Sequence, residues 1–233
     1  MRKRNTGGLY LSKQKERYNK ILDILETTYP DAHCELVHES AFELLIATVL
    51  SAQTTDKKVN QVTEKLFKKY NTAEAFAILQ QEELEKEIRE IGLYKNKAKN
   101  IIALSNMILE QYNGEVPATM EELVSLPGVG RKTANVVLSN AFGVPAIAVD
   151  THVYRVSNKI GLAKGKDVTD TEEQLMKNIP RERWSKAHHL LIFHGRRTCA
   201  ARKPNCSECT VNSYCKEYEK ELKKQNKEKQ QDV

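Results

Sequence analysis

Apolar residues recur with helical spacing along almost the whole chain. Tyr18, Ile21, Leu22 and Leu25 stand at i, i+3, i+4 and i+7, which predicts a helix with one buried face. Similar stripes predict further helices around residues 44–47, 59–66, 84–91, 98–109 and 153–160. Only the short run 144–149 looks extended. The pattern therefore predicts an all-α protein.

Polar residues and glycines mark where these helices begin and end. Three pairs have the spacing of a capping box and predict helix starts: Ser40 with Glu43, Thr119 with Glu122, and Thr169 with Glu172. Gly92 follows one apolar stripe in the position that a left-handed C-cap prefers, and Gly114 follows another. The helices are thus expected to be short and joined by tight turns.

Length and charge limit the classes of protein. The chain has 233 residues with 37 Lys and Arg against 31 Asp and Glu, a net charge of +6 that suggests a polyanionic partner. It contains no apolar run of about 18 residues, and no apolar signal region follows the basic N-terminus. We therefore expect a soluble, cytoplasmic protein without membrane contact, with flexible ends at residues 1–10 and from about 219 to 233.

Four cysteines near the C-terminus carry the clearest chemical signal. Cys199, Cys206, Cys209 and Cys215 have the spacing C-x6-C-x2-C-x5-C within a basic stretch. Four thiolates so close together can surround one metal centre, and the spacing fits either zinc or an iron–sulfur cluster. Two disulfides or four buried thiols are the alternatives, although a reducing compartment disfavours disulfides. Cys34 lies far away in sequence and is expected to be a small buried residue.

A second signal is the segment Leu126–Ala134, which contains a Gly-x-Gly turn between two predicted helices. Glycines allow a backbone to approach a ligand closely, and the first amides of the next helix form an anion site that suits a DNA phosphate. Many helical hairpins use Gly-x-Gly only to turn, so the pattern alone is weak. No strand precedes it, which argues against a dinucleotide fold. A degenerate copy occurs at 91–98.

Two residues suggest chemistry beyond DNA binding. Lys132 opens the helix after the turn, and Asp150 follows eighteen residues later. A lysine is a nucleophile only when neutral, and a nearby carboxylate can orient it or accept a proton. Lys132 could equally be a solvated or phosphate-contacting lysine. Asp150 precedes a helical pattern, so it is also a good N-cap.

These segments together resemble the endonuclease III family of helix–hairpin–helix DNA repair glycosylases. The resemblance is carried by Leu126–Leu138, Ala148–His152 and the four-cysteine set, and it is supported by Leu50–Asp56, Ile91–Tyr94 and Gly114–Pro117. It covers roughly residues 15 to 218. The motifs in combination are highly specific.

The resemblance implies two helical lobes with a DNA-binding cleft between them. One lobe, about residues 37–145, would be a helical barrel with the helix–hairpin–helix motif. The other would join residues 1–36 to residues 146–233 and hold a [4Fe-4S] cluster on Cys199, Cys206, Cys209 and Cys215. The partner would be double-stranded DNA with damaged bases or abasic sites, and the protein would be a monomer.

The resemblance also implies roles for individual residues. Lys132 matches the nucleophile and Asp150 the essential carboxylate. Gln53 matches a residue that fills the gap left by an extruded base, and Leu93 matches a wedge into the opposite strand. The remaining DNA-binding residues would be those of the hairpin and of a basic loop: Gly128, Val129, Gly130, Arg202 and Lys203.

The implied activity is base excision repair of oxidised pyrimidines by a bifunctional DNA glycosylase and AP lyase. A lysine Schiff base would form, and β-elimination would break the strand 3′ to the abasic site. Two alternatives remain at this point. One is a monofunctional glycosylase of the same fold, although the adenine-specific branch lacks a lysine at the position of Lys132. The other is a non-enzymatic iron–sulfur DNA-binding protein, which leaves the pairing of Lys132 with Asp150 unexplained.

Overall fold

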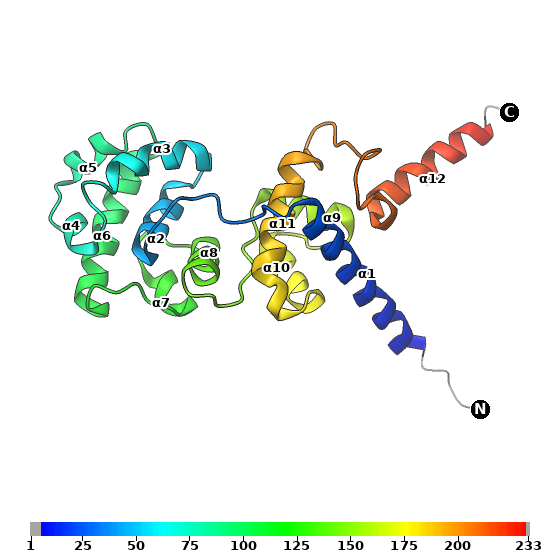
Figure 1. Ribbon diagram of the computed structural model, residues 1–233, viewed down its shortest axis with the longest axis horizontal. Helices are drawn as coiled ribbons and strands as arrows, with labels where there is room; N and C mark the ends of the chain where they lie inside the picture. Colours follow the sequence, from blue (N-terminus) through cyan, green and yellow to red (C-terminus); the bar gives the residue numbers. More distant parts are fainter. Residues whose placement is uncertain (1–5, 232–233) are drawn as a thin grey trace. The chain divides into compact units, whose positions relative to one another are not determined.

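The computed structural model describes residues 6–231 and contains helices but no strand within that range (Figure 1). The all-helical class expected from the apolar periodicity is confirmed. The chain divides into two compact units. The first contains Met1–His33 and Val149–Val233, and the second contains Cys34–Ala148.

The second unit is a group of helices packed around one central helix. Nearly every residue of α2 (Ala41–Leu50) is buried, and α2 packs against α3 (Asp56–Leu66), α6 and α8. The long helix α6 (Tyr94–Tyr112) also packs against α4 (Ala73–Ala77) and α5 (Gln81–Glu87). Helices α7 (Met120–Ser125) and α8 (Arg131–Ala141) pack on each other and complete the unit.

The first unit joins the N-terminal helix to the C-terminal third of the chain. Helix α11 (Trp184–Arg197) packs against α9 (Thr151–Ile160) and α1 (Thr6–Thr28), while α10 (Val168–Asn178) packs on α9. A short 3-10 helix, η1 (Arg181–Arg183), precedes α11. The cysteine loop then leads through η2 (Asn212–Tyr214) into α12 (Lys216–Gln231), which packs on α9.

Most of the predicted helix boundaries are confirmed, and two are wrong. Ser40 and Thr119 cap α2 and α7 as expected, each accepting a bond from the backbone three residues later. The start of α10 is capped by Asp167 rather than by the Thr169–Glu172 pair. Gly92 is not left-handed; the left-handed residue is Leu93, with φ 59°. In each case a nearby residue takes the expected role. Asp167 accepts the capping bond of α10, and Leu93 adopts the left-handed backbone.

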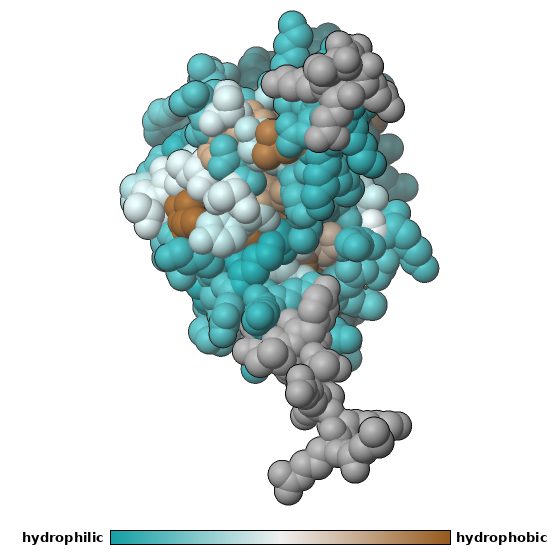
Figure 2. Space-filling model, turned by 90° about the vertical axis from the view of Figure 1, so that its right-hand side faces the viewer, coloured by the Kyte–Doolittle hydropathy of each residue, from teal (hydrophilic) through white to brown (hydrophobic). Residues whose placement is uncertain are grey.

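Three further expectations concern the ends of the chain, the extended run 144–149 and contact with a membrane. Residues 1–5 and 232–233 lie outside the described range, whereas residues 6–10 and 219–231 are helical. The run 144–149 is irregular rather than a strand. No helix in the described chain is long and apolar enough to cross a membrane. The coloured part of the face in Figure 2 is mainly hydrophilic with small, separate hydrophobic spots.

Candidate functional site

The turn between α7 and α8 has the geometry of an anion-binding hairpin. Gly128 has φ +78°, and a Cβ there would lie 2.9 Å from the side chain of Asn100. The amide of the buried Val129 donates to the oxygen of Leu126 at 3.0 Å, which closes the turn. Gly130 is the N-cap of α8 without a side-chain cap, and a Cβ there would meet no atom within 4 Å. The start of α8 therefore offers backbone amides beside open space.

Lys132 and Asp150 each stand at the start of a helix. Lys132 is exposed in the first turn of α8, whose buried side is formed by residues 134–138. Asp150 is the N-cap of α9, and its Oδ1 accepts a bond from the amide of Val153 at 2.7 Å. Asp150 is therefore the N-cap of α9, as one of the two interpretations of the sequence predicted, and this bond uses one of its two carboxylate oxygens. The two residues belong to different units of the chain.

The two expected wedge residues both lie at the surface of the second unit. Gln53 is exposed in the loop after α2, with φ 57°. Leu93 is 58% exposed and precedes α6 with φ 59°. An exposed leucine in the left-handed region is costly twice over, because its backbone is strained and its apolar side chain meets water. Such a combination indicates a functional constraint rather than a packing one.

The four cysteines lie on a loop that is tied to the rest of the first unit. All four are free thiols of intermediate burial. The amide of Cys199 bonds to the oxygen of His194 at 2.7 Å, and that of Cys215 bonds to the oxygen of Asn212 at 3.0 Å. The Sγ atom of Cys209 lies 3.7 Å from His194 Nε2. The Sγ atom of Cys215 lies 3.6 Å from the main-chain oxygen of Lys159.

The donor set fits a metal cluster chemically, although the side chains are not arranged around a metal. Burial raises the pKa values of the Cys199, Cys206 and Cys209 thiols. The negative charge of a Cys215 thiolate would raise all three pKa values further, and Glu221 also raises that of Cys206. Lys159 opposes this for Cys199 and Cys206. A cationic iron centre would favour all four thiolates. In residues 6–231, no three His, Cys, Asp or Glu side chains already form a metal-binding group.

Two arginines hold the ends of the cysteine loop. Arg17 of α1 donates to the oxygen of Tyr214 at 3.1 Å and to that of Gly161 at 3.0 Å. Arg155 of α9 donates to the oxygen of Cys199 at 3.0 Å. Sequence reasoning missed both residues, because main-chain carbonyls far along the chain leave no sequence pattern.

A polar chain reaches the same loop from Tyr29, the residue that follows α1. Tyr29 Oη lies 3.0 Å from His194 Nδ1 and 2.7 Å from Thr198 Oγ1. Burial lowers the pKa of His194 to about 4, so the ring is neutral near pH 7. A neutral ring with Nδ1 facing Tyr29 can present Nε2 to Cys209. The loop is thus supported by side chains from α1, α9 and α11.

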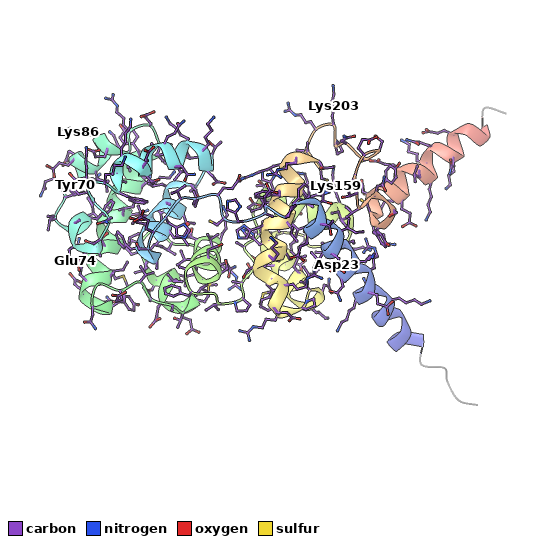
Figure 3. All side chains as sticks on the ribbon, viewed as in Figure 1. Asp23, Tyr70, Glu74, Lys86, Lys159 and Lys203 are labelled. Atoms are coloured by element: carbon purple, nitrogen blue, oxygen red, sulfur yellow. The ribbon has the colours of Figure 1, made fainter. Side chains whose placement is uncertain are left out.

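The basic residues of the loop face outward. Arg202 and Lys203 are exposed between Cys199 and Cys206, and Lys203 has φ 56°. Figure 3 marks Lys203 on the loop after α11 and Lys159 near the cysteine segment. The backbone bond from the Asn205 amide to the Thr198 oxygen, 3.0 Å long, closes this part of the loop. Two adjacent cations are therefore presented on a constrained turn.

Comparison with known proteins identifies the family of this chain. Residues 46–181 match the model of the HhH-GPD superfamily base excision DNA repair proteins. The chain is 56% identical to endonuclease III of Bacillus subtilis (strain 168) over 204 residues, 87% of this chain and 93% of that protein. The chain belongs to the endonuclease III family. Endonuclease III of Escherichia coli (strain K12) is 50% identical over 88% of this chain and 98% of its own length.

Solved structures agree with this family membership. A trapped endonuclease III–DNA covalent intermediate, an estranged-adenine complex, matches with a TM-score of 0.85 and 54% identity over 89% of this chain and 98% of that one. A thermostable thymine-DNA glycosylase is more distant, with a TM-score of 0.79 and 26% identity over 90% of this chain and 98% of that one. As a member of the endonuclease III family, the chain is a base excision repair enzyme, a DNA glycosylase and AP lyase.

Proposed function

We propose that this enzyme removes oxidised pyrimidines from double-stranded DNA and then cuts the strand 3′ to the abasic site, with Lys132 as nucleophile. The observation that carries the proposal is the position of Lys132. It is exposed in the first turn of α8, directly after the Gly128–Gly130 hairpin. A phosphate bound at that hairpin would bring the neighbouring sugar within reach of the helix start.

Lys132 would act through a covalent intermediate with the DNA sugar. Its neutral amine attacks C1′, the C1′–N bond to the base breaks, and the base leaves with a proton. The C1′–O4′ bond then breaks and O4′ takes up a proton, which gives a protonated Schiff base that acidifies a C2′ hydrogen. Loss of that proton breaks the C3′–O bond, and hydrolysis returns the lysine. Asp150 assists deprotonation and offsets positive charge on the sugar.

The surrounding residues supply binding and extrusion. A damaged base must leave the stack before its sugar carbon can be attacked, and poorly paired lesions leave at lower cost. Gln53 and Leu93 would fill and wedge the resulting gap. Gly128, Val129 and Gly130 would bind one phosphate through the backbone, and Arg202 and Lys203 would contact the DNA backbone elsewhere.

We also infer a [4Fe-4S] cluster on Cys199, Cys206, Cys209 and Cys215, with a structural role. The support is the set of four free thiols on one tied loop, together with family membership. A cluster bound by the four cysteines would tie both ends of the loop together and so hold the Arg202–Lys203 turn in place. Purified protein should contain about four irons and matching sulfide per chain. A folded, colourless protein with one zinc would contradict this assignment.

The remaining features follow from this activity. We infer a monomer that acts in the cytoplasm on chromosomal DNA. A mainly hydrophilic face supports the monomer (Figure 2). Size-exclusion chromatography with light scattering, at concentrations above those used for activity, tests the oligomeric state.

Borohydride trapping tests the nucleophile. An oligonucleotide with one oxidised pyrimidine should cross-link to the wild-type chain when reductant is present during turnover. Lys132→Ala should abolish cross-linking and nicking but retain lesion binding, whereas Lys86→Ala, which removes an exposed lysine of α5, should behave as wild type. Cross-linking by Lys132→Ala would move the nucleophile elsewhere. Binding without nicking by the wild type would favour the monofunctional or non-enzymatic alternatives.

Asp150→Asn separates chemistry from capping. Asn caps helices about as well as Asp, so this change should leave stability nearly unchanged. Loss of the charge should slow excision by roughly a hundredfold, as expected for a positioned acid–base group. Normal excision would reduce Asp150 to the N-cap of α9. Single-turnover kinetics and thermal melts make the comparison.

A further inference from the structure

One buried charge in the second unit has no part in the chemistry proposed above. Lys97 of α6 is only 5% exposed. Its ammonium group donates to the main-chain oxygens of Leu50 at 2.9 Å and Ala52 at 2.7 Å, and burial lowers its pKa. A buried ammonium group destabilises a fold unless it is well bonded, so an apolar residue would be the simpler choice here. The position suggests a task that needs those two bonds.

Both carbonyls lie at the root of the loop that carries Gln53. Leu50 is the last residue of α2, where carbonyls lack helical partners and the helix dipole is negative. Ala52 directly precedes Gln53, whose backbone is left-handed. The Thr54 amide closes the loop by bonding to the Ser51 oxygen at 3.0 Å. Lys97 therefore caps α2 and fixes the chain on the approach to Gln53.

Leu93 directly precedes α6, the helix that carries Lys97, as its N-cap. The Lys97 amide donates to the oxygen of Leu93 at 3.1 Å, so the two residues are one turn apart at the start of α6. The preceding Gly92 lies against the loop, since a Cβ there would be 3.9 Å from the oxygen of Gln53 and from Thr54 Oγ1. The Leu93 turn and the Gln53 loop are thus neighbours. The Lys97 backbone bonds to the Leu93 turn, and the Lys97 side chain bonds to the Gln53 loop.

We propose that Lys97 is a positioning residue that holds the Gln53 loop and the Leu93 turn as one unit, so that both side chains enter the base stack together. The inference rests on the proposed DNA roles of Gln53 and Leu93. Holding both loops in place before binding removes the entropic cost of ordering each one on DNA. A methionine could fill the space of Lys97 but would leave two carbonyls without a donor.

Hydrogen exchange on the free enzyme tests the coupling without DNA. Lys97→Met should speed amide exchange in residues 51–56 by about tenfold or more, with little change in the first unit. Lys99→Met is the matched control, since it removes an exposed lysine from the same helix. Unchanged exchange in residues 51–56 would overturn the proposal. If Lys97→Met does not fold, Lys97→Gln takes its place. Its side chain is one bond shorter and cannot reach both carbonyls, so faster exchange in residues 51–56 is again expected.

Two DNA substrates separate positioning from general damage to the fold. A paired oxidised pyrimidine must be extruded, whereas a preformed abasic site has no base to extrude. Lys97→Met should lower the single-turnover excision rate about tenfold more than it lowers cleavage at the abasic site. An equal loss on both substrates would mark Lys97 as merely structural and overturn the positioning role.

A double-mutant comparison distinguishes this inference from the proposed function. Gln53→Ala should slow excision, and adding Lys97→Met should then cost less than it does alone, because the positioned side chain is gone. If Gln53→Ala and Leu93→Ala both leave excision unchanged, the proposed wedge roles fail. The exchange measurement on residues 51–56 is made without DNA, so its result does not depend on the wedge roles.

Discussion

At the scale of single residues, backbone strain coincides with proposed DNA contacts. Four non-glycine residues have positive φ in the described chain: Gln53, Leu93, Asn113 and Lys203. Asn113 ends α6, and asparagine tolerates this conformation well. The other three are the residues expected to meet DNA. Strain kept at such positions is typical of a functional constraint.

Leu93→Asn should therefore separate stability from activity. Asparagine relieves the left-handed strain, so we expect the free energy of unfolding to be equal or up to about 1 kcal/mol higher. Excision of a paired lesion should fall, because the apolar wedge is lost. Asn113→Leu is the reciprocal control, expected to lose about 1 kcal/mol with excision unchanged. Urea unfolding and single-turnover assays measure both, and undiminished excision by Leu93→Asn would remove the wedge.

His189 predicts how stability depends on pH. Burial, with smaller contributions from His188 and His33, lowers its pKa to about 3 from the usual 6.5. The unfolded chain therefore binds more protons between these values, and stability falls as pH drops below about 6.5. At pH 5 the loss from this residue is about 2 kcal/mol relative to pH 7. In His189→Gln, the gap between the urea midpoints at the two pH values should narrow by this amount, while the buried His194 keeps a contribution of its own. An unchanged gap would assign the dependence to other groups.

The residues that sequence could identify differ in kind from those it missed. Lys132 and the four cysteines lie in compact motifs, so the sequence could single them out as candidates, and the family resemblance then implied their roles. Lys97 bonds to carbonyls that approach it only when α2 packs on α6. Its spacing with Ile101 and Leu104 does place a lysine on the apolar stripe of α6, which is the one sequence signal that could have found it.

At the scale of elements, the two glycines of the hairpin between α7 and α8 have different reasons to be glycine. Gly128 is required by the fold, because its φ is +78° and Asn100 fills the space beside it. Gly130 has an ordinary extended φ of −95° and open space around it, so the free protein does not need a glycine there. The sequence could predict the turn but not this division. Open space beside uncapped amides supports a ligand at Gly130.

Alanine at each position tests that division. Gly128→Ala should lose at least about 1 kcal/mol of stability, because the left-handed backbone disfavours a side chain. Gly130→Ala should fold normally yet bind DNA more weakly, and Gly130→Val more weakly still. Thermal melts and fluorescence anisotropy on undamaged duplex provide the two readouts. Normal affinity for Gly130→Val would leave the hairpin as a turn without a phosphate contact.

Helix boundaries show a similar limit of sequence reasoning. Ser40 and Thr119 cap their helices because no better cap lies nearby. At α10, Asp167 accepts from the Asp170 amide at 2.9 Å and starts the helix two residues before Thr169. Aspartate is a stronger N-cap than threonine, and the packing of Thr171 and Leu175, both fully buried, is consistent with the helix start that Asp167 gives.

At the scale of the whole molecule, the two units contribute different chemistry. The second unit holds Lys132, the hairpin and the wedge residues, and the first holds Asp150 and the cysteine loop. The proposed reaction needs both units to engage the same stretch of DNA. Apolar periodicity predicted the helices of each unit. It could not predict that α1 joins the C-terminal part, since that depends on contacts such as Arg17 with Tyr214.

The net charge of +6 makes the strength of DNA binding depend on salt, and the cysteine loop should account for a definite part of that dependence. Each cation that neutralises a phosphate releases condensed counterions, so its removal lowers the slope of log K against log salt by roughly 1. We expect that change for Arg202→Ala and for Lys203→Asn, with asparagine chosen because it suits the φ of 56°. Both variants should weaken binding about equally for damaged and undamaged duplexes, because phosphates carry no lesion information.

The same salt titration of DNA binding includes a control variant and a test of the cluster. Lys86→Ala, with an exposed lysine on α5, removes one charge outside the proposed contacts and should leave the slope unchanged. Loss of the cluster should lower the slope by as much as the double variant Arg202→Ala with Lys203→Asn, because the loop would no longer hold both cations in place. A cluster-free protein with the full slope would separate the metal from DNA binding altogether.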